Sequence, residues 1–160
     1  MTVVRVQPVP LTLEDLTVML RADEPNYGAA TTVGPDAFPH LEALVRGADE
    51  LLAERATAFA SRTNDERAAD LLRWATQSPS TRIRTQAAYG ARYLLGNDAA
   101  DVLTTLIGDA DAGVRSVAIK STTTVFDRGT VPPDIAAAVS RLTQDDPEAF
   151  IREMSRDARA

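Results

Sequence analysis

The chain has 160 residues, a formal net charge of −6, and 44% hydrophobic against 25% charged residues. We therefore expect neither a disordered nor a membrane-spanning protein, and the acidic balance argues against nucleic-acid binding, which depends on clustered Lys and Arg. Cysteine is absent, which excludes disulfides and thiolate metal sites. The N-terminus lacks the features of a signal peptide, so we expect a cytoplasmic location. Lys120 is the only lysine among 17 basic residues, a bias that we interpret as the composition of a GC-rich bacterial source.

The N-terminal part of the chain predicts a lead-in followed by two short helices. Residues 1–11 form an extended lead-in, because they contain two prolines, which supply no amide donor to a helix or sheet. A helix is expected at about 12–22, where Thr12 offers a capping side chain and Asp15 a carboxylate in the first turn. A shorter, weak second helix is expected over 26–33.

From Gly34 onward the sequence repeats itself with a shift of 31 residues. The shift aligns apolar residues over three consecutive units without gaps. The aligned sets are Leu41, Leu72 and Leu103; Leu52, Ile83 and Val114; and Ala56, Ala87 and Ala118. A period in this range is typical of a solenoid built from one repeated supersecondary unit.

Each unit contains two stretches with apolar residues at i, i+3 and i+4, which predicts a hairpin of two one-sided helices. The predicted hairpins span about 35–62, 65–95 and 98–126, and a fourth follows a loop at 127–133. The sequence therefore predicts an all-α fold, a right-handed α-solenoid with a period of about 31 residues. We expect residues 12–160 to form a single domain.

The turns inside these hairpins carry a recurrent motif. Segments 109–118 and 146–152 match the pattern D-P-x-x-x-V-R-x-x-A, and segment 78–87 matches it with Ser78 in place of the first Asp. Over about residues 35–158 the chain resembles the HEAT-like repeat family, particularly its bacterial short-repeat type. The resemblance implies a fold used for scaffolding, assembly and partner recognition of many kinds. Segment 47–53 departs from the motif, because it lacks the Arg.

Three arginines, Arg84, Arg115 and Arg152, occupy equivalent places in the repeats, and Asp109 and Asp146 precede two of them. The interpretation that we favour is a ladder of Asp–Arg pairs that joins the turns of successive repeats. The alternative is a clamp for a phosphate or carboxylate, since guanidinium groups in register can present paired donors.

A second stripe lies beside the buried face of the middle repeat. Arg82, Gln86, Tyr89 and Tyr93 follow one another at spacings of four, three and four residues, which places them on one side of a helix. Their counterparts in the neighbouring repeats are Arg55, Arg62, Lys120 and Thr124. Second helices usually line the concave surface of a solenoid, and Tyr and Arg often dominate binding, so this stripe is a candidate binding ridge. The alternative is that the tyrosines only pack between repeats.

Tryptophan and histidine each occur once in the chain. Trp74 is the only tryptophan and is either an exposed interface anchor or, as we favour, part of ordinary packing. His40 is the only histidine, so no His-based metal site can form.

These observations predict a non-catalytic protein–protein interaction or scaffold module that binds a protein partner. We expect no cofactor, no metal, no nucleic acid and no membrane, and a monomer or weak homodimer. The alternative is an accessory or enzyme-like repeat protein that acts on a small molecule or modified substrate. That alternative requires convergent acid–base residues in a cleft, against which stand one histidine and no cysteine.

Overall fold

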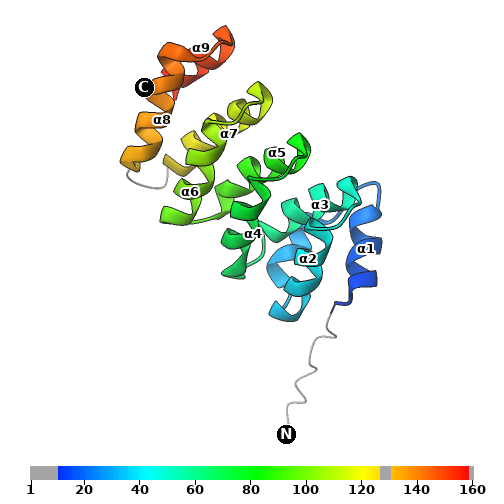
Figure 1. The fold of residues 1–160 in the computed structure, drawn as a ribbon. Helices are drawn as coiled ribbons and strands as arrows, with labels where there is room; N and C mark the ends of the chain where they lie inside the picture. The colour runs from blue at the N-terminus through cyan, green and yellow to red at the C-terminus, as the bar shows by residue number, and fades with distance from the viewer. Residues whose placement is uncertain (1–10, 127–130, 159–160) are drawn as a thin grey trace, which may run out of the picture.

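The computed structural model describes residues 11–126 and 131–158, and in these two ranges the chain forms helices and no strand. Most helices pair into hairpins that stack along one direction (Figure 1). The α-helices are α1 (Leu13–Arg21), α2 (Phe38–Val45), α3 (Glu50–Ala60), α4 (Arg67–Ala75), α5 (Thr81–Gly90), α6 (Gly96–Ile107), α7 (Ala112–Phe126), α8 (Pro133–Asp145) and α9 (Ala149–Asp157). Three 3-10 helices, η1 (Tyr27–Thr32), η2 (Pro35–Ala37) and η3 (Ala91–Tyr93), connect or extend them.

The hairpins form the predicted all-α solenoid. The first helices α2, α4, α6 and α8 lie along one side of the stack, and the second helices α3, α5, α7 and α9 lie along the other (Figure 1). Each second helix packs against the next one, α3 on α5, α5 on α7 and α7 on α9. In the described part of the chain no helix is long and apolar enough to cross a bilayer.

The first predicted helix is confirmed, whereas the second has a different form. Thr12 and Asp15 make a reciprocal capping box at the start of α1, and their hydrogen bonds lower the pKa of the Asp15 carboxyl. Residues 27–32 form the 3-10 helix η1 rather than an α-helix. In η1 the hydroxyls of Thr31 and Thr32 donate to backbone carbonyls three residues earlier, which competes with regular helical bonding.

Two other predicted segments lie mostly outside the described residues. They are the extended lead-in at 1–11 and the loop at 127–133, of which the structure describes only residue 11 and residues 131–133.

The core includes the residues that the 31-residue shift aligns. All nine of them are buried, from Leu41 in α2 to Ala118 in α7. Alanines at the centre of the second helices let neighbouring helices approach closely. Gly90 at the end of α5 has no side chain and allows a still closer approach. A Cβ atom at Gly90 would lie 2.7 Å from the Ser61 Cβ and 2.9 Å from the Leu72 Cδ2, so glycine is required for the approach of α5 to α3.

The predicted Asp–Arg ladder is present at two rungs. Arg84 donates to Asp109 through Nε and Nη2 at 2.7 and 3.1 Å, and Arg115 donates to Asp146 in the same way at 2.7 and 3.0 Å. The Nη1 atoms of both arginines also donate to carbonyls in the turns of their own hairpins. Each arginine therefore ties its own turn to that of the following repeat. The hydrogen bonds with Asp109 raise the pKa of the Arg84 guanidinium.

Candidate protein-binding face

The four residues of the predicted stripe lie on α5 and on η3, which continues it, and two of them reach solvent. Arg82 has an exposed side chain, 62% accessible, and Tyr93 is 44% exposed, whereas Gln86 and Tyr89 are half-buried between them. Helices α3 and α7 flank α5 on either side. We call the surface that these three helices share the second-helix face. Its residues are Leu51, Glu54, Arg55, Arg62, Arg82, Gln86, Tyr89, Tyr93, Val117 and Lys120, with Tyr27 and Arg92 at its edge.

A cluster of tyrosines surrounds Arg62 at one end of this face. The Arg62 guanidinium carbon lies 4.7 Å from the ring centre of Tyr93, 5.0 Å from that of Tyr27 and 5.6 Å from that of Tyr89. The rings of Tyr89 and Tyr93 lie 6.3 Å apart, and Arg92 stacks on Tyr89 at 4.5 Å. Cation–π contacts of this kind contribute about 0.5–1 kcal/mol each at exposed sites. The tyrosines thus pack between repeats, and Tyr93 still presents a ring to solvent.

A polar network occupies the other end of the stripe. Gln86 Nε2 donates to Glu54 Oε1 at 3.3 Å, and Arg82 Nε lies 3.2 Å from Glu54 Oε2. The second contact is an ion pair without hydrogen-bond geometry, because Glu54 Oε2 is buried and has no hydrogen-bond partner. Glu54 therefore links α3 to α5 and supplies the negative charge in this part of the face.

The remaining predicted site residues have separate positions. Arg55 donates to the carbonyls of Leu20 and Ala22 at 2.6 and 2.9 Å, which fastens the end of α1 to α3. Lys120 is exposed on α7. Trp74 lies on the first helix α4, not with the stripe, where the Arg46 guanidinium covers its ring at 5.1 Å and leaves it 36% exposed.

Sequence reasoning missed five members of this face: Leu51, Val117, and the three that make the contacts described above, Tyr27, Arg92 and Glu54. Tyr27 lies in η1, before the repeats begin, so no alignment of repeats could bring it to Arg62. Arg92 aligns with Ser61 and Thr123, and neither neighbouring repeat carries a charge at that position. The 31-residue shift aligns Glu54 with Thr85, one position before Gln86, so its place beside the predicted stripe was open to sequence reasoning.

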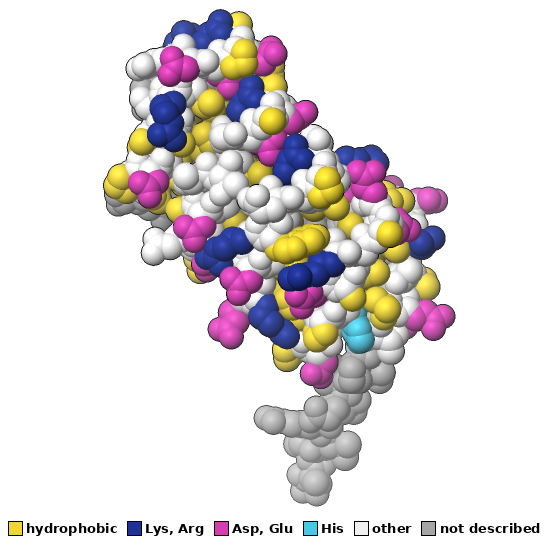
Figure 2. Space-filling view, in the orientation of Figure 1, with side chains coloured by type: hydrophobic (Ala, Val, Ile, Leu, Met, Phe, Trp, Pro, Cys, Tyr) yellow, Lys and Arg dark blue, Asp and Glu magenta, His cyan; other side chains and the backbone are white. Residues whose placement is uncertain are grey.

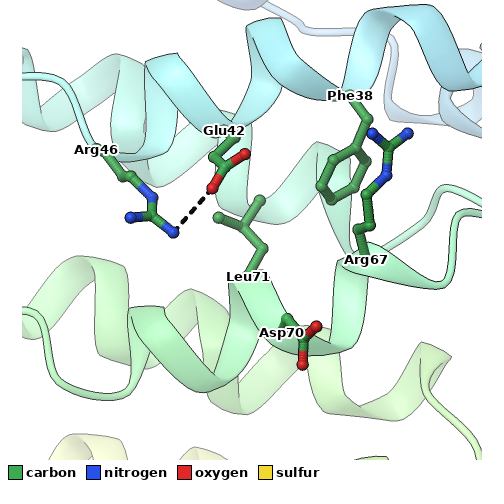
Figure 3. A pocket seen from close by; sticks show the side chains of 6 residues that line it. All are labelled: Phe38, Glu42, Arg46, Arg67, Asp70 and Leu71. Carbon is green, nitrogen blue, oxygen red and sulfur yellow. Dashed lines mark ion pairs between the residues drawn. The ribbon is translucent and has the colours of Figure 1, made fainter.

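A small pocket opens between α2 and α4, on the first-helix side. It has a volume of about 160 Å³ and is lined by Phe38, Glu42, Arg46, Arg67, Asp70 and Leu71. Figure 3 shows Glu42 turned toward Arg46 on one side of Leu71, and Phe38 beside Arg67 on the other. The ion pair between Arg46 and Glu42 measures 2.8 Å, and Arg67 pairs with Asp65 next to the pocket. Its arginines are therefore already neutralised.

No group of His, Asp and Glu side chains suited to a metal ion occurs within residues 11–126 and 131–158.

Comparison with known proteins identifies the fold. The sequence matches no protein-family model and no curated protein sequence. The structure is similar to that of the complex of CpcE and CpcF of phycocyanin lyase from Nostoc sp. PCC7120, with a TM-score of 0.71 and 18% identity over 92% of this chain and 98% of that one. The chain has a HEAT- and armadillo-like repeat fold. A designed armadillo repeat protein in complex with the peptide (KR)4 is also similar, with a TM-score of 0.60 and 15% identity over 91% of this chain and 73% of that one.

Proposed function

We propose that this repeat protein is a non-catalytic interaction module that binds a partner protein through the second-helix face. The observation that carries the proposal is the pair of exposed side chains, Arg82 on α5 and Tyr93 on the adjoining η3, beside the Arg62–tyrosine cluster. Tyr and Arg are the residue types, with Trp, that most often dominate the free energy of protein–protein binding.

The face is also ordered before a partner arrives. Arg62 holds Tyr93 and Tyr89 through ring contacts, and Glu54 holds Gln86 and Arg82 through its carboxylate. Side chains fixed in this way lose less conformational entropy on binding, so more of the contact free energy appears as affinity.

The structural neighbours support a polypeptide ligand. One neighbour is a complex of two proteins, and the other is a complex with a peptide. Repeat arrays of this type present long surfaces on rigid helices, which suits the recognition of a partner segment. We propose that the protein works in this way as a monomer or weak homodimer.

The alternative is an accessory protein that acts on a small molecule or modified substrate. The likeness to a phycocyanin lyase complex favours it. The α2–α4 pocket is the place for such a ligand, and its arginines would have to exchange the carboxylates of Glu42 and Asp65 for ligand groups. Saturation by a small ligand that Arg67→Ala abolishes would favour this alternative over partner binding.

The test compares two exposed aromatic residues on opposite sides of the solenoid. Wild type, Tyr93→Ala and Trp74→Ala are used to capture proteins from an extract of the cells that make this protein, after circular dichroism has shown equal folding. We expect a partner to be retained by wild type and Trp74→Ala and lost by Tyr93→Ala. Equal capture by wild type and Tyr93→Ala would overturn the assignment of the second-helix face.

A further inference from the structure

We propose that the segment bound on the second-helix face is an acidic peptide, whose Asp or Glu carboxylates bind Arg62 and Lys120. This inference rests on the proposed function and adds the chemistry of the partner. Its basis is a local excess of positive charge on a protein whose net charge is −6.

Arg62 lacks an anionic partner within the described part of the chain. Its Nη1 donates to the Ala58 carbonyl, and its other close neighbours are the three uncharged tyrosine rings. The residue is half-buried, so little water screens its charge. A guanidinium presents its donors in a planar fork that fits a carboxylate with two hydrogen bonds. A carboxylate of a bound ligand would therefore supply the anionic hydrogen-bond partner that the Arg62 guanidinium lacks.

The neighbouring cations reinforce this charge. Arg55 donates only to the neutral carbonyls of Leu20 and Ala22 among the residues described, and Lys120 is exposed on α7, two repeats further along the solenoid. Glu54 is the acidic member of the face as defined above, and it pairs with Arg82. Arg55 and Arg62 on the first repeat and Lys120 on the third are thus the cations open to a ligand of opposite charge, which would bind with electrostatic steering.

The first-helix side shows the opposite arrangement. Figure 2 shows basic and acidic side chains lying next to one another over α2 and α4. Arg46 pairs with Glu42, Arg67 with Asp65, and Arg73 with Asp98 and Asp101. The arginines of α2 and α4 are therefore matched within the described residues, unlike Arg55 and Arg62 on the second-helix face.

The exposed apolar side chains beside the cations favour a peptide over a nucleic acid. Leu51, one helical turn before Arg55, is 43% exposed, and Tyr93, in contact with Arg62, is 44% exposed. Burial raises the pKa of the Tyr27 hydroxyl, which keeps it protonated and able to donate to a carboxylate beside Arg62. A nucleic acid would bind this face more weakly than an acidic peptide, because its affinity depends on many Lys and Arg contacts and this protein is acidic overall.

The test selects peptides from a random library of about twelve residues, using the full chain as bait. We expect the selected peptides to be enriched in Asp and Glu, interspersed with apolar residues. A selected peptide is then synthesised and its affinity measured by fluorescence anisotropy. Arg62→Gln should weaken binding about tenfold, because one well-placed charged contact commonly contributes that much. The control Arg141→Gln removes an exposed arginine on α8 and should change nothing.

A variant that should strengthen binding distinguishes a lost contact from loss of binding through misfolding. Glu54→Gln removes the carboxylate that competes for Arg82, so it should strengthen binding of the same peptide severalfold. If circular dichroism shows that Arg62→Gln is unfolded, Lys120→Gln replaces it, with weaker binding expected.

Several outcomes would overturn the inference. Selected peptides that are neutral or basic but depend on Tyr93 would overturn the acidic ligand and leave the proposed function standing. Failure to select any peptide, or acidic peptides indifferent to Arg62 and Glu54, would also overturn it. Displacement of the peptide by a thymidine oligonucleotide at equal charge concentration would show general polyanion binding instead.

Discussion

Arg115 on α7 and Asp146 in the turn before α9 form a bidentate ion pair, and both side chains are buried, Arg115 with 8% and Asp146 with 2% of its side chain exposed. Arg115→Ala should lower the free energy of unfolding by about 3–5 kcal/mol, because it leaves the Asp146 carboxylate buried without its cation. Urea denaturation measures the change. Arg141→Ala serves as the control and should stay close to wild type. A similarly small effect of Arg115→Ala would mean that the ladder does not hold the last repeats together.

The Asp–Arg ladder lacks a rung between the first two repeats. Ala53 occupies the position of Arg84 one repeat earlier, and Ser78 occupies that of Asp109. Both residues are buried. Ala53→Arg alone should destabilise the protein, because it places a charge near Ser78 without a carboxylate. Adding Ser78→Asp should recover part of the loss, with a coupling of about 1–3 kcal/mol in a double-mutant cycle. Simple additivity of the two changes would show that the first repeats lack the geometry of a rung.

Replacement of Gly90 by a residue with a side chain is predicted to destabilise the protein. In Gly90→Ala the new methyl group would meet Ser61 and Leu72 at distances below 3 Å, so α5 must move away from α3. Overpacking of this kind costs about 1–3 kcal/mol, which thermal or urea unfolding would detect. Gly34→Ala is a matched control, because nothing lies within 4 Å of a Cβ at that position. Equal stability of the two variants would contradict the close approach of the helices.

Asp65 should make stability depend on pH in the acid range. Hydrogen bonds from Arg67 hold the pKa of the Asp65 carboxyl below its ordinary value. Its contribution is therefore fully present above about pH 4, the unfolded value, and is lost as the pH falls through the lower folded value. Wild type should exceed Asp65→Asn in unfolding free energy at pH 7, and the difference should shrink as the pH falls below the unfolded value. A difference that does not change with pH would exclude this ion pair as its cause.

The solenoid could be predicted because its core repeats in the sequence. Positions such as Leu72 and Ala87 face the same environment in each repeat, so one residue shift identifies the hairpins and the register of the ladder. The segment 26–33 has no such repeat partner. Its 3-10 form depends on local hydrogen bonds of Thr31 and Thr32, which periodicity does not reveal.

The candidate face was predictable in part for the same reason. Helical spacing places Arg82 to Tyr93 on one stripe, and the repeat shift adds Arg62 beside it. Two contacts of the cluster were not predictable in this way: that of Arg62 with Tyr27, which lies outside the repeats, and that of Arg92 with Tyr89, because Arg92 has no charged counterpart in the neighbouring repeats. The role of these residues in binding a partner stays a prediction.

Photo-crosslinking in the cells that make this protein tests the central claim most directly. A photoreactive phenylalanine derivative replaces either Tyr93 on the second-helix face or Trp74 on the first-helix side, two aromatic residues of similar exposure. The account predicts a crosslinked partner protein from position 93 and none from position 74. Crosslinking from position 74 alone would place the interface on the first-helix side and contradict the account.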